Sequence, residues 1–214
     1  MSGERGLTRN VLLLGAEGML ARDILGEAPA TIEVSSRSRA ELDVTDEHAV
    51  TAAIAQLQPD VIINCAAYTN VDGAEGERER AFAVNSEAPG AFGRAAAAPA
   101  HHSPLTPLVV HFSTDYVFDG RSTRPYLEAD PTTPLGVYGA SKLAGEQALL
   151  QSGARCLIIR SSWLYGLHGR SFPRTMWQRA IDRKATRVVN DQRGRPTYTV
   201  DLERAVWALL GNGK

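Results

Sequence analysis

Five short apolar runs, separated by stretches of helical composition, constrain the fold of this chain more than any other feature. Each run is rich in β-branched residues and bounded by turn residues, which is typical of strands buried on both faces of a sheet. The resulting βαβαβαβαβ order predicts an α/β fold, a Rossmann-type doubly wound parallel sheet with helices on both faces. The expected strands cover residues 10–15, 31–36, 60–67, 108–114 and 155–162, and the expected helices cover residues 18–27, 46–57, 75–98 and 135–151.

The composition excludes several other classes of protein. The 214 residues are 43% hydrophobic and 22% charged, which suits a globular chain with an ample core. A net charge of −1 gives no electrostatic reason to expect nucleic acid or a membrane surface as a partner. A polar N-terminus without a long apolar run predicts a cytoplasmic protein. We expect Cys65 and Cys156 to be buried thiols and expect no metal site, because the His101–His102 pair lies in a Pro/Ala-rich loop.

The first functional motif is GAEGMLA, residues 15–21, between the first expected strand and helix. Gly15 suits a tight turn, and Gly18 would let the backbone approach a diphosphate at a helix N-terminus. A merely structural strand–helix turn is the alternative, because the spacing is GxxGxxA rather than GxGxxG. The position after the first buried strand favours dinucleotide binding.

The segment SSRSR, residues 35–39, ends the second expected strand. A protein that binds NAD usually places an Asp or Glu near this point to hold the adenosine ribose. Hydroxyl groups and the guanidinium groups of Arg37 and Arg39 instead suit a 2′-phosphate, which favours NADPH over NADH. NADH stays an alternative cofactor, and a solvated basic loop is the alternative interpretation of the segment.

A lysine stands out in VYGASKLAGE, residues 137–146. The chain has three lysines and twenty arginines, so Lys142, four residues after Tyr138, indicates a need for a compact ammonium group. On a helix this spacing puts both side chains on one face. The cation would lower the pKa of Tyr138 and suit it to proton transfer near neutral pH. The alternative is an ion pair between Lys142 and Glu146 on an exposed helix.

Neighbouring residues define the setting of this pair. Thr133 and Pro134 predict the start of the helix, as a hydroxyl cap followed by proline in the first turn. Ser113 and Thr114, at the end of the fourth expected strand, are expected to project their hydroxyls toward the same crevice. His111, within that strand, is expected to fill the core.

Taken in order along the chain, eight segments resemble the dTDP-4-dehydrorhamnose reductase family of the extended short-chain dehydrogenase/reductase superfamily. Several motifs in the right order are more specific than any one of them. The segments are GAEGML (15–20), LDVTD (42–46), PDVIINCAAYTNVDGAE (59–75), VNSEAP (84–89), STDYVFDG (113–120), YGASKLAGE (138–146), RSSWLYG (160–166) and VVNDQRGRPTY (188–198).

The resemblance implies a role for each matching residue. Thr114 matches the catalytic hydroxyl and Tyr138 the proton donor, while Lys142 matches the residue that holds the nicotinamide ribose and tunes the tyrosine. The resemblance also implies a set of cofactor-binding residues, to which Tyr138 and Lys142 belong. The others are Gly15, Gly18, Met19, Leu20, Asp43, Val44, Ala66, Ala67 and Tyr68. Arg37 is added to this set because of its place in the SSRSR segment. The implied substrate-binding residues are Thr69, Thr114, Asp115 and Trp163.

Three further residues keep two interpretations each. Asn85 matches an asparagine that is frequent in the superfamily, and its alternative role is to satisfy a helix kink. Arg193 and Arg195 could clamp a substrate diphosphate, or they could belong to a solvated loop.

The implied function is the NADPH-dependent reduction of a nucleotide-activated 4-keto-6-deoxysugar, in deoxysugar or polysaccharide biosynthesis. The expected partner is a dTDP-linked sugar, and a homodimer is compatible with the superfamily. One alternative is a nucleotide-sugar epimerase or dehydratase, and another is a non-catalytic regulatory subunit that binds NADP. Intact Thr114, Tyr138 and Lys142 favour the enzyme.

The length of the chain departs from the family. We expect residues 1–165 to form the dinucleotide-binding domain and residues 166–214 to form a partial, truncated substrate lobe, because members of this family normally continue well beyond this point. The expected consequence is an incomplete sugar pocket. The metal site that some members form at an interface draws on the missing region, which is a second reason to expect no metal.

Overall fold

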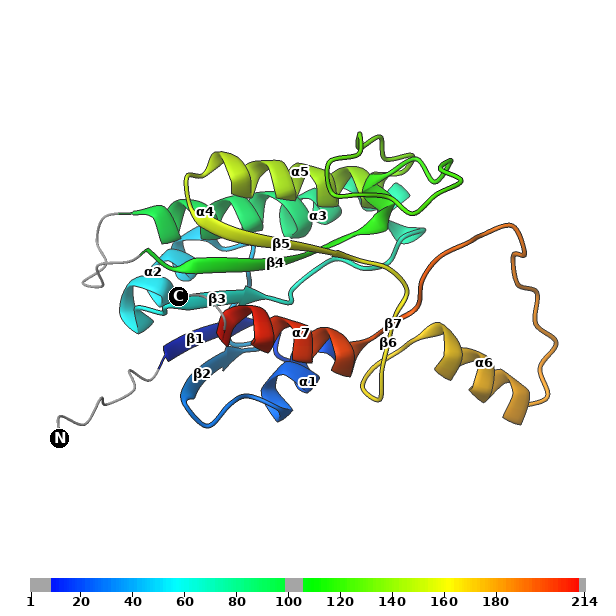
Figure 1. Cartoon of the computed structure of the whole chain (residues 1–214), viewed down its shortest axis with the longest axis horizontal. Coiled ribbons are helices and arrows are strands. Elements are labelled where there is room, and N and C mark those ends of the chain that lie inside the picture. Colours follow the sequence, from blue (N-terminus) through cyan, green and yellow to red (C-terminus); the bar gives the residue numbers. More distant parts are fainter. Residues whose placement is uncertain (1–8, 99–105, 212–214) are drawn as a thin grey trace.

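The structure, a computed structural model, describes residues 9–98 and 106–211, so the His101–His102 pair lies outside the described residues. At its centre is a five-stranded parallel sheet in the order β2-β1-β3-β4-β5 (Figure 1). All five predicted strands are present. They are β1 (Arg9–Leu14), β2 (Ile32–Arg37), β3 (Val61–Asn64), β4 (Leu108–Thr114) and β5 (Arg155–Ser161).

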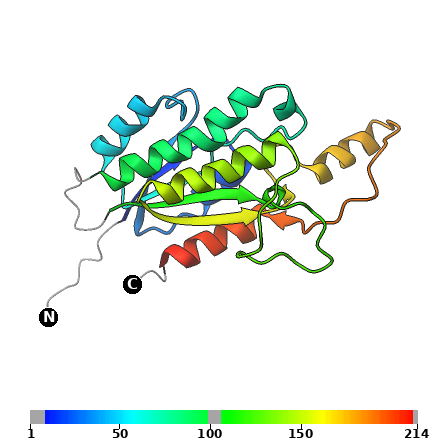
Figure 2. The same ribbon diagram turned by 90° about the horizontal axis from the view of Figure 1, so that it is seen from above.

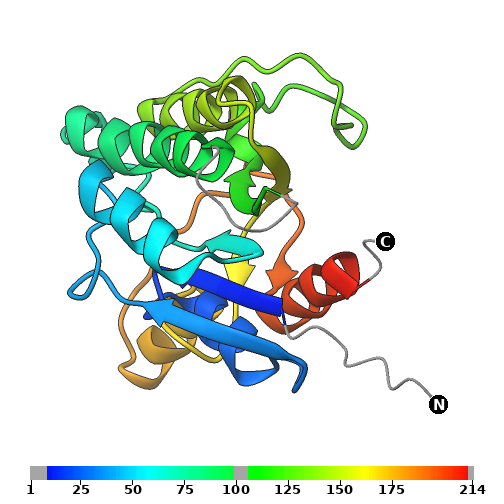
Figure 3. The same ribbon diagram turned by 90° about the vertical axis from the view of Figure 1, so that its left-hand side faces the viewer.

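Helices cover both faces of this sheet (Figure 3). One face carries α1 (Met19–Gly26) and α7 (Thr199–Gly211), which contact each other. The opposite face carries α2 (Glu47–Leu57), α4 (Ala88–Ala97) and α5 (Val137–Gln151). The predicted Rossmann-type doubly wound sheet is therefore confirmed. The strand order switches direction between β1 and β3, and ligands of such folds bind at that switch, beyond the carboxyl ends of the strands.

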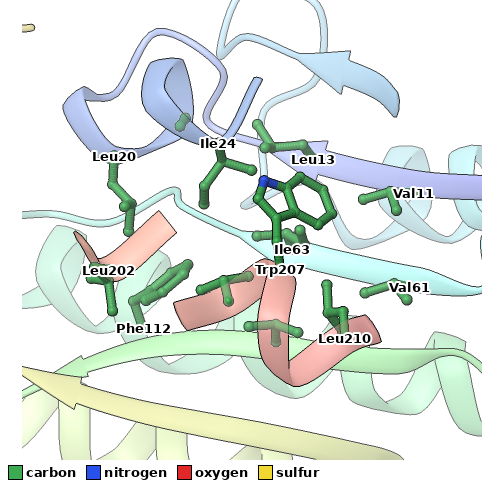
Figure 4. Close-up of a cluster of buried hydrophobic side chains, with 13 residues drawn as sticks. Val11, Leu13, Leu20, Ile24, Val61, Ile63, Phe112, Leu202, Trp207 and Leu210 are labelled. Atoms are coloured by element: carbon green, nitrogen blue, oxygen red, sulfur yellow. The ribbon is translucent and has the colours of Figure 1, made fainter. Parts of the chain in front are cut away.

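Side chains of β1 alternate between two hydrophobic cores, because successive residues of a strand point to opposite faces. Val11 and Leu13 pack in the cluster that includes α1 and α7, whereas Leu12 and Leu14 pack with α2 and α4. In the first cluster the buried indole of Trp207, from α7, lies among side chains of β1 and β3 (Figure 4). Burying one such apolar side chain contributes about 1.5–3 kcal/mol, so packing on both faces fixes the strands that carry the site.

For the helix predicted over residues 75–98 the start is wrong, because the continuous helical run covers residues 78–97 and contains a π-helical turn. The fully buried amide of Asn85 lies in this turn and bonds the backbone of Tyr68. Widened turns of this kind are frequent at functional sites. The stretch consists of a 3₁₀ turn (Gly73–Glu75), α3 (Arg78–Phe82), a π-helical turn (Ala83–Glu87) and α4.

The predicted start of α5 at Thr133 and Pro134 is also wrong. The helix begins at Val137, and Gly136 is its N-cap residue in an extended conformation. The N–H of Val137 donates to Oε1 of Glu75 at 2.8 Å, so a carboxylate 62 residues earlier in the chain caps the helix. A partner that distant leaves no local signal around residue 133.

A small extension lies beyond the carboxyl ends of the strands (Figures 1 and 2). It contains β6 (Leu164–Tyr165), which pairs in parallel with β7 (Thr197–Tyr198), and α6 (Phe172–Ile181), which buries none of its side chains. After β7 the chain returns to the sheet as α7. The division into domains after residue 165 stays a prediction. None of the helices in the described ranges is long and apolar enough to cross a bilayer.

Candidate active site

A cavity of about 240 Å³ opens at the carboxyl ends of β1 and β3, where the strand order switches. Three predicted groups of residues meet there: the glycine turn, the segment after β2 and the segment after β3. Doubly wound sheets bind nucleotides at this position. The predicted cofactor-binding residues that line the cavity are Gly15, Gly18, Asp43, Val44, Ala66, Ala67 and Tyr68.

The turn at Gly15 requires glycine for two independent reasons. Its φ of 77° lies in the left-handed region, which side chains disfavour. A Cβ at this position would also lie 2.7 Å from the backbone nitrogen of Ala66. The N–H groups of Gly15 and Ala16 donate to the carbonyl of Arg37 at 2.9 and 3.0 Å, so the ends of three strands converge. This bare backbone beside the first turn of α1 fits the diphosphate of a dinucleotide.

Met19 and Leu20, the other predicted members of the glycine loop, form the first turn of α1. Gly18 is the N-cap residue and supplies no side-chain hydrogen bond, which leaves the first N–H groups of the helix available to an anion. The side chain of Leu20 is buried in the core under α1, so any cofactor contact from this residue would use its backbone. Both assignments stay predictions.

The arginines near the cavity differ in position. Arg37, the predicted ligand, donates to the carbonyl of Ser36 at 2.8 Å, whereas Arg39 lines the cavity and lies 3.7 Å from Asp43. Arg80 lines the cavity as well, and was not among the predicted residues. It belongs to a run of alternating charges, which is typical of a solvated helix face, so the sequence carried no signal for it.

A second cluster joins the end of β4 to the start of α5. The Thr114 hydroxyl donates to Oδ1 of Asp115 at 3.1 Å and accepts the N–H of Tyr116 at 3.2 Å. Thr114 also hydrogen-bonds the Tyr138 side chain. The hydroxyl of Ser113, predicted to share the crevice, is instead buried with no hydrogen-bond partner in the described part of the chain.

The cluster lies against the wall of the cofactor cavity. Gly139 lets α5 approach the turn after β4, since a Cβ there would lie 2.2 Å from the carbonyl oxygen of Tyr116. The rings of Tyr116 and Tyr138 meet edge to face, with centroids 5.6 Å apart. Tyr138 also packs against the apolar cluster of Tyr68, which lines the cavity. The predicted proton donor is therefore beside the predicted cofactor cleft.

The pKa of Tyr138 is shifted in the direction opposite to the prediction. Burial raises the pKa to about 12; the Asp115 carboxylate adds to this rise and the hydrogen bond with Thr114 opposes it. The predicted lowering by Lys142 is wrong for this structure, because the ammonium donates to the carbonyl of Phe112, at 2.6 Å. Desolvation of the phenolate therefore decides the sign.

Lys142 is only 2% exposed, so the alternative of an exposed ion pair with Glu146 is wrong. Glu146 instead makes a two-point ion pair with Arg160, at 2.6 and 2.9 Å. Burial lowers the pKa of Lys142 to about 8, and the Glu146 carboxylate opposes that shift. His111 is buried as predicted, yet it does more than fill space: its ring nitrogens face Lys142 and Asn64.

Asn85 ties the cofactor wall to α5. Its Oδ1 accepts the N–H of Tyr68 at 2.9 Å, and its Nδ2 donates to the Tyr68 carbonyl and to Oγ of Ser141, both at 3.0 Å. Gly145 permits the approach, because a Cβ there would overlap the Asn85 carbonyl oxygen. Asn85 lies in the π-helical turn, but the backbone groups that its amide satisfies belong to Tyr68, so both interpretations of this residue stay predictions.

The predicted sugar-binding residues other than Thr114, which ends β4, each follow the carboxyl end of a strand of the sheet. Thr69 is exposed in the loop after β3, and Asp115 belongs to the cluster itself. Trp163 has a φ of 49°, which is rare for a bulky residue and marks local strain. Its indole packs so closely on Gly194 that a Cβ there would lie 2.6 Å from the ring. These substrate assignments stay predictions.

The exposed arginines and the cysteines add no second site. Arg193 and Arg195 are exposed on either side of Gly194, so both interpretations of them stay open. Cys65 and Cys156 are free thiols that are only partly buried, which corrects the prediction that they are buried. Desolvation raises the pKa of Cys65 to about 12. Within residues 9–98 and 106–211, no three His, Cys, Asp or Glu side chains gather as a metal site.

Comparison with known proteins decides the family. The model described as the RmlD substrate binding domain matches residues 9–214. A dTDP-4-dehydrorhamnose reductase of Mycolicibacterium smegmatis is 41% identical over 97% of this chain and 62% of its own length. The chain belongs to the dTDP-4-dehydrorhamnose reductase family. A dTDP-4-keto-6-deoxy-D-glucose reductase of Streptomyces niveus, also 41% identical, is matched over 97% of this chain and 70% of its own length.

Solved structures agree with this family. The dTDP-4-dehydrorhamnose reductase of Bacillus anthracis, in complex with NADP, superposes with a TM-score of 0.89 and 34% identity, over 96% of this chain and 71% of that chain. A UDP-glucose 4-epimerase of Thermus thermophilus shares the fold alone, because its identity is only 19%. It superposes with a TM-score of 0.80 over 94% of this chain and 74% of that chain. The chain spans about two thirds of the length of the curated relatives it matches, 62% and 70% for the two above.

Proposed function

We propose that this chain reduces the 4-keto group of a dTDP-linked 4-keto-6-deoxysugar, such as dTDP-4-dehydrorhamnose, to a hydroxyl with NADPH, in deoxysugar or polysaccharide biosynthesis. The observation that carries the proposal is the partly buried Tyr138 side chain, which lies next to Thr114 and beside a cavity that suits a dinucleotide. The names of the relatives, and the NADP complex of the Bacillus anthracis reductase, support the same reaction.

Each residue of the cluster has a role in this proposal. NADPH, when bound, supplies the hydride for the sugar carbon. Tyr138 gives its proton to the keto oxygen as negative charge develops there, and its raised pKa keeps the phenol protonated through neutral pH. Thr114 aligns the phenol and can hydrogen-bond the same oxygen. Lys142 holds the nicotinamide ribose and so orients the cofactor toward the sugar.

The choice of NADPH rests on the cations at the cavity. Arg39 and Arg80 line it, and guanidinium groups match a 2′-phosphate well. Arg37 stays a predicted ligand that would need to leave the Ser36 carbonyl. NADH is the alternative cofactor, and the Asp43 carboxylate beside Arg39 could serve it by binding the adenosine side.

Sugar recognition is assigned to Thr69, Asp115 and Trp163, all beyond the carboxyl ends of the strands. The chain spans about two thirds of its relatives' length, so sugar turnover is the property that an assay must establish. The homodimer and the cytoplasmic location stay predictions.

The test is consumption of NADPH with dTDP-4-dehydrorhamnose as acceptor, compared between the wild type, Tyr138→Phe and Tyr198→Phe. Tyr198 is a matched control, because its ring stacks on Tyr165 in the extension. The change to Phe removes the same hydroxyl group but leaves the Thr114–Tyr138 cluster intact. We expect Tyr138→Phe to lose about 100-fold or more in kcat with unchanged NADPH affinity, and the control to match the wild type. NADPH binding without turnover in the wild type would contradict the reductase and favour a regulatory subunit.

A further inference from the structure

A buried chain of hydrogen bonds connects the cofactor wall to Lys142 through two residues that the proposed reaction does not use. Asn64 ends β3, and His111 lies opposite it on β4 in the strand register. Nδ2 of Asn64 is 3.0 Å from Nδ1 of His111, and Nε2 of His111 is 3.4 Å from Nζ of Lys142. The three residues are 2%, 1% and 2% exposed. Polar groups buried this deeply require defined hydrogen-bond partners.

The cofactor wall determines where the protons of this chain lie. The backbone N–H of Ala66, which can only donate, bonds Oδ1 of Asn64 at 3.0 Å. The Asn64 amide must therefore present its NH₂ group to His111, and Nδ1 of His111 must accept. A neutral imidazole with an accepting Nδ1 carries its proton on Nε2. That proton points at Lys142.

The consequence falls on the Lys142 ammonium, which has three donors and no acceptor. The Phe112 carbonyl takes one of them at 2.6 Å. We propose that Asn64 and His111 are positioning residues for Lys142. Asn64 keeps the His111 proton on Nε2, and this proton prevents the ring from accepting a hydrogen bond from the ammonium. The other donors of the Lys142 ammonium therefore stay available for the cofactor. The proposal rests on the reductase function proposed above.

The surrounding charges agree with a neutral ring. Burial lowers the pKa of His111 well below its usual value, and the Lys142 charge lowers it further. Lys142 faces Glu146 on its own helix, which is paired with Arg160 of β5, and Asp115 lies at the end of β4 beside Tyr138. Among the described residues, neither Glu146, Arg160 nor Asp115 lies within hydrogen-bond distance of Nε2 of His111. The group that faces the Nε2 proton is therefore the Lys142 ammonium.

Nuclear magnetic resonance tests the arrangement without sugar or cofactor. The chain has three lysines and five histidines, so ¹⁵N labelling of each residue type resolves Lys142 and His111 once the His111→Phe spectrum assigns the ring. We expect the His111 nitrogens to show a neutral ring protonated at Nε2 from mildly acidic to alkaline pH. A ring protonated at Nδ1, or at both nitrogens, would overturn the proposal.

Two variants test the effect on Lys142 by its sign. In Asn64→Asp the carboxylate accepts from both Ala66 and the ring, which moves the His111 proton to Nδ1 and turns Nε2 into an acceptor for the ammonium. The Lys142 titration should then move to alkaline pH, by about tenfold in proton concentration. His111→Phe removes the opposing donor and should move the titration the same way. A shift to acidic pH, or no shift, in folded His111→Phe would overturn the proposal.

Cofactor binding distinguishes this proposal from the reductase itself. Asn64→Asp should weaken NADPH binding about tenfold, the size of one charge-assisted hydrogen bond, because the ammonium is drawn to the ring. Asn190→Asp, an exposed site with the same change of charge, should bind NADPH as the wild type does. Equal NADPH affinity in Asn64→Asp and the wild type would overturn the positioning role. If the resonance results hold while the wild type fails to reduce the sugar, only the reductase function falls.

Discussion

Asn85 holds the backbone of Tyr68 at both of its polar groups, accepting the N–H at 2.9 Å and donating to the carbonyl at 3.0 Å. The Asn85 amide thus makes the two backbone hydrogen bonds that a neighbouring strand would make. It fixes the loop after β3, although the loop itself has no regular secondary structure at Tyr68. Because Tyr68 lines the cofactor cavity, the shape of that cavity depends on a residue in the widened helix 17 positions further along the chain.

Replacing Asn85 with Leu should therefore destabilise the protein and loosen the cavity. The change leaves the N–H and the carbonyl of Tyr68 buried and unpaired, at an expected cost of about 2–4 kcal/mol in the free energy of unfolding. Urea denaturation measures this cost. Asn190→Ala, at an exposed position, should stay within about 0.5 kcal/mol of the wild type; a similar small change for Asn85→Leu would show that the loop holds itself.

Two glycine substitutions separate backbone strain from loss of the cofactor cradle. Gly15 and Gly153 have φ values of 77° and 80°, but only at Gly15 would a Cβ meet other atoms, those of Cys65 and Ala66. We expect Gly153→Ala to cost about 1–2 kcal/mol and to keep its NADPH affinity. Gly15→Ala should cost more and weaken NADPH binding at least about tenfold. Titration of cofactor fluorescence measures both, and equal affinities would contradict the cradle.

The carboxylates of Asp115 and Asp119 should change stability with pH in opposite senses. Burial raises the pKa of Asp115, so the folded state holds the carboxyl proton more tightly than the unfolded state does. The stability of the protein therefore falls as the pH rises from below the ordinary carboxyl pKa of about 3.9 to above the raised pKa. Relative to the wild type, Asp115→Asn should gain stability between about pH 3 and pH 7.

Asp119 provides the reference of opposite sign. Hydrogen bonds from the N–H of Arg121 and the hydroxyl of Tyr126 lower the pKa of Asp119. The contribution of Asp119 to stability is therefore present above the ordinary carboxyl pKa and is lost as the pH falls through the lowered pKa. Relative to the wild type, Asp119→Asn should lose stability over the same rise in pH. Urea unfolding of both variants at several pH values checks the signs, and parallel pH profiles would refute the assigned burial of Asp115.

Cofactor preference should follow Arg39, which lines the cavity. Arg39→Gln should weaken NADPH binding about tenfold and leave NADH binding unchanged, because one charge-assisted contact with the 2′-phosphate is lost. Arg37→Gln should have little effect, since its guanidinium bonds the Ser36 carbonyl. If the loss appears in Arg37→Gln instead, the interpretation made from the sequence is right and the cavity lining is misleading.

The sheet could be predicted from the sequence because burial on both faces leaves β-branched apolar runs that few other structures produce. The start of α5 and the widened turn at Asn85 could not be predicted, because the partners found there are distant in sequence: Glu75 caps Val137, and Asn85 bonds Tyr68. Patterns of 3.6 residues describe a helix's own faces and contain no information about such partners.

The candidate site shows the same division. The spacing of Tyr138 and Lys142 correctly placed both on one helix, α5. The direction of the Tyr138 pKa depends instead on burial and on the Phe112 carbonyl that receives the ammonium. His111 was expected only to fill space, because the hydrogen bonds that give it a defined proton come from β3 and α5. Three-dimensional neighbours, and not spacing, decide these properties.

The central claim is that hydride reaches the keto carbon of a dTDP-linked sugar at this site. Incubation with dTDP-4-dehydrorhamnose and NADPH deuterated at the transferable position, followed by mass spectrometry and magnetic resonance of the sugar, tests it most directly. We predict one deuterium at C4 of a newly formed 4-hydroxy sugar, absent with Tyr138→Phe. An isomerised sugar without deuterium, or an unchanged sugar in the presence of bound NADPH, would contradict the account.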